Sequence, residues 1–301
     1  MTKISAVVNT WNEEKNIERC LKSVKWVDEI VVTDMQSTDK TVEIAKKYGA
    51  KVFFHKYTGY VEPARNFALS KATGDWILIL DADEEIALSL ADKLIKVVEK
   101  NKCDFVRLPR KNIIFGKWIK NSRWWPDYNI RFFKKGKVSW SDKIHSVPLT
   151  RGKGKNLKSN EANAIVHYHY QSISQYLERL DRYTDVQVKE LIDSGYKFSW
   201  HDLLKKPTGE FLSRFFAGEG YKDSLHGLVL ALLQAFSELV KYLKIWEIQG
   251  FKAQKLSFSD FLSEMRRLGQ EVAYWLRTSL VKETKGPGKK FLLKIKQKLG
   301  Q

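Results

Sequence analysis

The first 90 residues alternate between short apolar runs and segments whose apolar residues recur at helical spacing. The runs at 4–9, 29–33, 50–55 and 76–80 predict strands, and the segments between them predict helices. Strands that alternate with helices in this way form a parallel sheet covered on both faces. The pattern therefore predicts a doubly wound α/β fold for this part of the chain.

A cluster of carboxylates follows the fourth run. Residues 76–80 are all apolar, which predicts a strand buried on both faces, and the next five residues include Asp81, Asp83, Glu84 and Glu85. Ligands of open α/β sheets bind just past the carboxyl ends of the strands, which is where Asp81 and Asp83 fall. Two carboxylates separated by one residue can share a divalent cation, and oxygen ligands suit Mg²⁺ or Mn²⁺ completed by substrate phosphates. A solvated acidic turn is the alternative.

Two other predicted strands also end in polar residues. The first ends at Asn9 and Thr10, and the second ends at Asp34. In a parallel sheet the carboxyl ends of the strands lie along one edge. We therefore expect these two ends and the acidic pair to form a single cleft.

The chain is strongly basic, with a net charge of +18 over 301 residues. Nucleic acid, an anionic membrane surface and phosphorylated substrates would all suit this charge. Zinc-finger spacing and the aromatic signature of RNA-binding domains are missing from the sequence. Cations are largely balanced by acids over the first 90 residues and exceed them later. We expect no nucleic-acid partner.

Cysteine usage and apolar runs bear on the compartment. Cys20 and Cys103 have neither metal-binding nor redox spacing, which predicts buried thiols in a reducing compartment. Residues 1–5 lead directly into a strand pattern and leave no room for a signal peptide. The sequence has no apolar run of about 18 residues, so no membrane span is predicted.

Four motifs carry a family resemblance. VVNTWNEE at 7–14, VTDMQSTD at 32–39, ARNFAL at 64–69 and LDAD at 80–83 resemble, in order and spacing, the family 2 glycosyltransferases. The resemblance covers residues 1–150. YNIRFF at 128–133 and WSDKIH at 140–145 are similar to lipopolysaccharide core glucosyltransferases. The resemblance implies the GT-A nucleotide-diphospho-sugar transferase fold, nucleotide-sugar donors and, as a rule, a divalent metal.

The resemblance also implies site residues. In the inverting reaction an acceptor hydroxyl attacks the anomeric carbon of the donor, and charge grows on the leaving diphosphate. The roles expected are Asp83 at a Mg²⁺ or Mn²⁺ ion, Asp81 at the metal or the ribose, Asp34 and Glu13 at the nucleoside, Arg65 near the base or diphosphate, and Thr10 at the nucleotide.

The sequence does not single out one residue as the catalytic base. Relatives often have a glutamate directly after the histidine of the last motif, where this chain has Ser146. Single displacement needs a group that takes the acceptor proton. Asp142 and His145 are equal candidates and Asp127 is a third. His167 alternates with a second histidine on a predicted strand, a pattern that is usually structural but could bind a metal.

After about residue 165 the sequence becomes helical. We expect a GT-A catalytic domain at 1–165, a helical region at 166–284 and a basic tail at 285–301. Residues 225–246 are apolar with a few polar interruptions, which indicates a helix packed on the body or lying in a membrane interface. The tail has six lysines and no acid, which suits an anionic membrane surface as well as a solvated end.

Together these features predict an inverting glycosyltransferase that moves a sugar, with a UDP-sugar the expected donor, to a cell-envelope glycan or lipid-linked acceptor. The predicted location is cytoplasmic and peripheral on the inner face of the cytoplasmic membrane. A nucleotidyltransferase of related fold is one alternative, although it would need a glycine-rich, lysine-bearing loop where residues 10–14 stand. A basic nucleic-acid-binding protein is the other.

Overall fold

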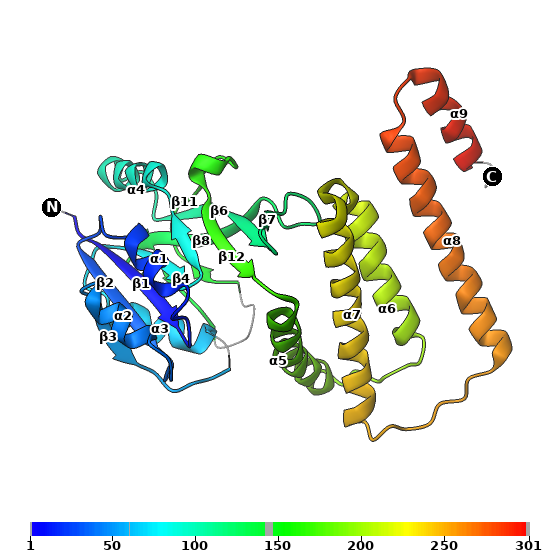
Figure 1. Ribbon diagram of the computed structural model, residues 1–301, viewed down its shortest axis with the longest axis horizontal. Helices are drawn as coiled ribbons and strands as arrows, with labels where there is room; N and C mark the ends of the chain where they lie inside the picture. The colour runs from blue at the N-terminus through cyan, green and yellow to red at the C-terminus, as the bar shows by residue number, and fades with distance from the viewer. Residues whose placement is uncertain (1, 60, 142–146, 299–301) are drawn as a thin grey trace. The chain divides into compact units, whose positions relative to one another are not determined.

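The computed structural model describes residues 2–59, 61–141 and 147–298. The chain divides into two compact units. Unit 1 comprises residues 1–118 and 124–171, and unit 2 comprises residues 119–123 and 172–301. Figure 1 shows the strands of unit 1 and the long helices of unit 2.

Unit 1 begins with the predicted alternation of strands and helices. Its elements are β1 (Ile4–Thr10), α1 (Ile17–Ser23), β2 (Glu29–Asp34), α2 (Thr41–Lys47), β3 (Lys51–Phe54), α3 (Glu62–Lys71), β4 (Trp76–Asp81), β5 (Glu84–Ile86) and α4 (Leu88–Lys100). The rest of the unit is mostly β: β6 (Phe105–Ile114), β7 (Lys117–Trp118), β8 (Asp127–Lys134), β9 (Val138–Ser139), β10 (Leu149–Thr150), β11 (Gly154–Asn156), η1 (Glu161–Asn163) and β12 (Ile165–Tyr170).

The main sheet of unit 1 has the strand order β3-β2-β1-β4-β8-β6-β12-β5. Its first four strands are parallel, as the alternation predicts. Strand β8 is antiparallel to both β4 and β6, and β12 is parallel to β6. The predicted α/β fold is confirmed, with a parallel half and a mixed half. The domain boundary expected at residue 165 falls at the start of β12, which belongs to unit 1.

Every residue of strand β4 from Trp76 to Leu80 is buried, which shows that this strand lies in the centre of the core. Leu78 and Leu80 pack with α1 and α4 on one face of the sheet, and Ile77 and Ile79 pack with α3 on the other. Burial on both faces is the reason that this strand reads as an unbroken apolar run.

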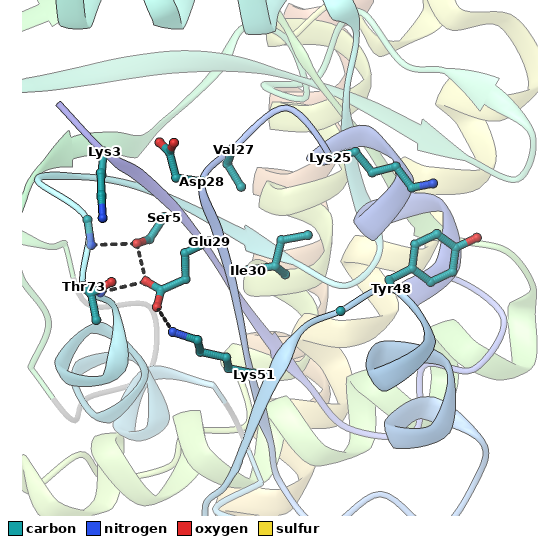
Figure 2. A pocket seen from close by; sticks show the side chains of 12 residues that line it. Lys3, Ser5, Lys25, Val27, Asp28, Glu29, Ile30, Tyr48, Lys51 and Thr73 are labelled. Atoms are coloured by element: carbon teal, nitrogen blue, oxygen red, sulfur yellow. Dashed lines mark hydrogen bonds and ion pairs between the residues drawn. The ribbon is translucent and has the colours of Figure 1, made fainter. Parts of the chain in front are cut away.

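The amino-terminal edge of the parallel strands encloses a hollow of about 550 Å³. Figure 2 shows Glu29 among the residues that line it, and its carboxylate accepts hydrogen bonds from Ser5 Oγ (2.6 Å), Lys51 Nζ (2.9 Å) and the backbone N–H of Thr73 (2.7 Å). Burial alone would raise the pKa of Glu29, but these bonds outweigh it and lower the pKa to about 2. Glu29 therefore ties β1, β2, β3 and the turn before β4 together, away from the carboxyl edge.

Unit 2 is helical, as the sequence predicts. It contains α5 (Ile173–Asp193), α6 (Asp202–Leu212), η2 (Ser213–Ala217), η3 (Gly220–Asp223), α7 (Ser224–Ile248), α8 (Phe258–Glu283) and α9 (Pro287–Lys298). Val188, Phe198, Tyr242 and Ile245 form its buried centre. The expected basic tail at 285–301 contains helix α9.

The short segment 119–123 joins unit 2 through the buried carboxylate of Asp223. That carboxylate accepts hydrogen bonds from the backbone N–H groups of Lys120 (3.2 Å) and Asn121 (2.8 Å). Ser122 Oγ donates to the carbonyl of Arg214 at 2.6 Å. Throughout the described ranges, none of the helices combines the length and apolar character that crossing a membrane requires.

Candidate active site

The carboxyl ends of β1, β2 and β4 lie side by side. In the strand register Asn9 is opposite Asp81, and Thr10 is opposite Asp34. The three polar strand ends that the sequence predicts at one edge are therefore brought together by the parallel half of the sheet.

Asn9 and Thr10 carry polar atoms that the described residues leave unsatisfied. Both residues are buried, and neither the side-chain amide of Asn9 nor Thr10 Oγ1 has a hydrogen-bond partner within the described part of the chain. Because a buried polar group without a partner costs about 1–3 kcal/mol, such groups at a sheet edge mark a place that a polar ligand can complete. Thr10 is an expected site residue, whereas the sequence places Asn9 at this edge without assigning it a role.

Asp34 braces the two loops that follow β1 and β2. Its carboxylate is fully buried and accepts hydrogen bonds from Ser37 N (2.8 Å) and Ser37 Oγ (2.5 Å). Ser37 Oγ in turn accepts the N–H of Asn12 at 2.8 Å, and Asn12 Oδ1 accepts the N–H of Thr38 at 2.8 Å. Asp34 thus lies at the expected edge and also holds the loops in shape.

Glu13 and Asp39 hold the same pair of loops. Glu13 Oε2 accepts a hydrogen bond from Asn16 Nδ2 at 2.7 Å, and the Glu13 N–H donates to Thr41 Oγ1 at 2.8 Å. Asp39 Oδ1 accepts the N–H of Thr41 at 2.9 Å, and its Oδ2 accepts the N–H of Glu14 at 3.0 Å.

Asp81 is held by two buried arginines. Its Oδ1 lies 2.9 Å from Arg65 NH2, and its Oδ2 lies 2.6 Å from Arg131 NH2. Burial alone would raise the pKa of Asp81, but Arg131 and Arg65 hold it well below its ordinary value. Since both carboxylate oxygens already face guanidinium groups, a metal ion there would meet two positive charges. The geometry therefore argues against Asp81 as a metal ligand. It also shows that Arg65 forms an ion pair with Asp81.

Glu84 extends this buried network. It is 0% exposed, and its Oε1 lies 2.9 Å from Arg131 NH2 and 3.2 Å from Arg110 NH1. Its Oε2 accepts the backbone N–H of Asp81 at 3.0 Å. Glu84 fixes the turn that separates Asp81 from Asp83. The acidic run in the sequence marks Glu84, but nothing local to it reveals its arginine partners.

Asp83 lies opposite a histidine of strand β12. Its Oδ2 is 3.5 Å from His167 Nε2, and both side chains are buried. His167 Nδ1 is 2.7 Å from Asn112 Oδ1, and its Nε2 is 3.3 Å from His169 Nδ1. Groups of three or more His, Cys, Asp or Glu side chains suited to a metal are not found among the residues that the structure describes. Asp83 and His167 nevertheless form a pair of one oxygen and one nitrogen ligand.

Asp127, the third candidate base, is engaged on all sides. It accepts hydrogen bonds from Arg110 Nε (2.8 Å), Asn112 Nδ2 (3.2 Å) and Asn129 Nδ2 (3.1 Å). Burial would raise the pKa of Asp127, but Arg110 outweighs burial and lowers it. A carboxylate with a lowered pKa is a poor proton acceptor, so its environment argues against a role as base. The two preferred candidates, Asp142 and His145, lie outside the described residues.

Comparisons with known proteins agree with the resemblance seen in the motifs. The family model for glycosyl transferase family 2 matches residues 5–151. An uncharacterized glycosyltransferase of Rickettsia typhi is 33% identical over 270 residues, which cover 86% of this chain and 92% of the relative.

One further relative and one solved structure carry more specific names. The lipopolysaccharide core biosynthesis glycosyltransferase LpsC of Rhizobium meliloti is 22% identical over 260 residues, which cover 83% of this chain and 94% of that one. Among solved structures, TarS of S. aureus in complex with UDP aligns with a TM-score of 0.46 and 17% identity, over 80% of this chain and 91% of that chain.

Proposed function

Because the chain belongs to glycosyltransferase family 2, we propose that it transfers a sugar from a UDP-sugar, with inversion at the anomeric carbon, to a cell-envelope glycan or lipid-linked acceptor. The observation that carries the donor half of this proposal is the set of unsatisfied polar atoms of Asn9 and Thr10 beside Asp34 at the carboxyl edge. The name of the Rhizobium relative motivates the acceptor half.

The nucleoside would bind across the ends of β1 and β2. The side-chain amide of Asn9 offers two donors and one acceptor, which complement the alternating carbonyl and N–H groups of a uracil ring. Thr10 Oγ1 offers a further hydroxyl. Asp34 and Glu13 would contact the nucleoside from loops that their own hydrogen bonds already hold in shape, which limits the entropy lost on binding.

Asp83 and His167 would hold the divalent cation, Mg²⁺ or Mn²⁺. Their facing ligand atoms, 3.5 Å apart, fit a cation whose other positions are completed by substrate phosphates. When bound, such a cation neutralises the charge that grows on the departing diphosphate. Asp81, with its two arginines, would position the strand end and the turn that carries Asp83 rather than bind the metal.

The acceptor hydroxyl must lose its proton as it attacks. We assign this proton to Asp142 or His145, as the sequence predicts, and give Asp127 a structural role because Arg110 stabilises its charged form. A base whose carboxylate is paired with an arginine would be weakened by that pairing.

A lipid-linked acceptor requires the enzyme to reach a membrane surface, which we propose happens from the cytoplasmic side. Helix α7 has four large apolar residues that share one face and remain exposed: Leu225, Leu232, Phe236 and Leu243. Helix α8 repeats the arrangement with Phe258, Leu262, Met265, Leu276 and Leu280. The six lysines of 285–301 add positive charge. Apolar burial and electrostatic attraction together anchor a protein better than either alone.

The function is tested by incubating the purified full-length chain with a panel of nucleotide sugars and measuring released nucleoside diphosphate. We expect release with one UDP-sugar, strengthened by an envelope glycolipid acceptor and lost on chelation of divalent cations. Release of pyrophosphate from nucleoside triphosphates, with no diphosphate from any sugar nucleotide, would favour the nucleotidyltransferase alternative and overturn the proposal.

A further inference from the structure

We propose that Asn112 is a positioning residue that fixes the tautomer of His167, so that the Nε2 lone pair of His167 faces Asp83 and the two side chains bind one divalent cation. The cation's part in sugar transfer rests on the proposed function. The hydrogen-bonding argument for Asn112 and His167 does not, because it follows from donors, acceptors and strand register alone.

The orientation of the Asn112 amide follows from two acceptors. Asn112 is 0% exposed, and its Nδ2 lies 2.9 Å from the carbonyl oxygen of Trp124 and 3.2 Å from Asp127 Oδ2. A backbone carbonyl and an ionised carboxylate only accept hydrogen bonds. The opposite orientation of the amide would set oxygen against oxygen at both places, so Oδ1 must be the atom that faces His167.

The orientation of Asn112 determines which nitrogen of His167 carries a hydrogen. Asn112 Oδ1 is 2.7 Å from His167 Nδ1 and can only accept, so Nδ1 is the protonated nitrogen. In a neutral imidazole the other nitrogen, Nε2, then has a lone pair. The Nε2 atom lies 3.5 Å from Asp83 Oδ2 and 3.3 Å from His169 Nδ1.

The strand register makes this arrangement rigid. His167 pairs with Asn112 across β12 and β6, and Asp127 pairs with Arg110 across β8 and β6. Arg110 holds Asp127 through Nε at 2.8 Å and NH2 at 2.6 Å. Arg110 and Asn112 lie two residues apart and so point to one face of β6. Three neighbouring strands thus support one imidazole ring.

When His167 is neutral, Nε2 and the facing Asp83 Oδ2 both carry lone pairs, and such atoms repel unless a positive species lies between them. Mg²⁺ takes its ligands at about 2.0–2.1 Å, which sets neighbouring ligands about 3 Å apart, close to the 3.5 Å between Asp83 Oδ2 and His167 Nε2. Histidine ligands of metals usually donate their other N–H to a carboxylate or carbonyl, which fixes the tautomer. Asn112 would supply that second hydrogen bond, and Asp127 with Arg110 would hold Asn112.

The tautomer can be read directly by long-range ¹H–¹⁵N spectra of full-length protein labelled at histidine, with His167→Gln to assign the signals. We expect the neutral ring of His167 to carry its hydrogen on Nδ1, and its Nε2 signal to shift on addition of Mg²⁺. A His167 that carries its hydrogen on Nε2, or on both nitrogens with no response to Mg²⁺, would overturn the proposal. This measurement uses no donor or acceptor, so its outcome is independent of whether sugar transfer is found.

Cation affinity gives the second readout, by electron paramagnetic resonance of unbound Mn²⁺ with and without UDP. Asn112→Leu should weaken Mn²⁺ binding by about 10- to 100-fold, the usual effect of losing such a partner. Asn129→Leu is the matched control, because Asn129 also donates to Asp127, at 3.1 Å, but has no bond to His167. It should change the affinity by less than about threefold. Equal Mn²⁺ affinity in Asn112→Leu and the wild type, or no Mn²⁺ binding by a folded wild type, would refute the cation half.

Discussion

Arg131 and Asp81 form a buried ion pair, with 2.6 Å between guanidinium NH2 and carboxylate Oδ2. Arg131 NH2 also lies 2.9 Å from Glu84 Oε1, and Arg65 NH2 forms an ion pair with Asp81 Oδ1. The first acid of the LDAD motif is thus bound to protein cations, whereas the second, Asp83, faces a histidine. The two acids of one short motif therefore have different chemical surroundings, and we expect their substitutions to have different effects.

Arg131→Met should lower the free energy of unfolding by about 3–5 kcal/mol, because it leaves Asp81 and Glu84 buried without their shared cation. Urea unfolding followed by circular dichroism measures this change. Lys47→Met is the control, since Lys47 pairs with Glu43 on the exposed face of α2 and should have little effect. A loss below about 1 kcal/mol for Arg131→Met would contradict the ion network.

Asp83→Ala should reduce transfer by at least about 100-fold and leave the fold intact, because it removes the oxygen ligand opposite His167. Transfer in the wild type should likewise require Mg²⁺ or Mn²⁺ and disappear in chelator. Asp92→Ala, on the exposed side of α4, is the matched control and should retain activity. Wild-type turnover in excess chelator would exclude the metal role of Asp83.

Asn9→Leu should affect stability and binding in opposite directions. The side-chain amide of Asn9 is buried and has no partner among the residues that the structure describes, so an apolar side chain of similar size should raise the free energy of unfolding by about 1 kcal/mol. The same change should weaken UDP binding about tenfold or more, measured by calorimetric titration.

Asn163→Leu serves as the counterpart of Asn9→Leu. Asn163 is also buried, but its Nδ2 donates to the Lys158 carbonyl at 2.7 Å. Its loss should lower stability by about 1–3 kcal/mol and leave UDP affinity unchanged. Unchanged UDP binding in Asn9→Leu would remove Asn9 from the donor site.

Glu29 should make folding stability depend on pH in the acid range. Its pKa is lowered from 4.5 to about 2 in the folded protein, so its contribution is fully present above about pH 4.5 and is lost as the pH falls towards 2. Glu29→Gln should therefore cost about 2 kcal/mol at pH 7, and progressively less below pH 4.5, by urea unfolding at several pH values. Glu99→Gln, on the exposed side of α4, is the control and should not change stability in this way. A pH-independent difference for Glu29→Gln would contradict the role of the ionised carboxylate.

The parts of the fold that sequence reasoning predicts are those with local signals. The apolar run ending at Leu80 marks β4 because burial on both faces leaves no alternation, and the helical period of 225–246 marks α7. The partners of these elements are set by register between distant segments. Arg131 reaches Asp81 across 50 residues, and Asn112 meets His167 across 55, only because β8 and β12 enter the sheet where they do. The sequence near Asp81 and His167 therefore does not reveal that Arg131 contacts the first and Asn112 contacts the second.

The last prediction concerns the membrane. We expect the full chain to sediment with anionic liposomes at low salt and to dissociate at high salt, because salt screens the electrostatic part of the attraction.

Deleting residues 285–301 should reduce binding without stopping transfer to a water-soluble acceptor, since the site lies in unit 1. Leu232→Glu with Phe236→Glu should weaken the binding that is seen at low salt, because both side chains lie on the exposed apolar face of α7. Leu88→Glu is the matched control, as Leu88 is 78% exposed in unit 1 and should not alter sedimentation. Equal binding to neutral and anionic vesicles would exclude the electrostatic part, and no sedimentation at any salt would exclude membrane docking altogether.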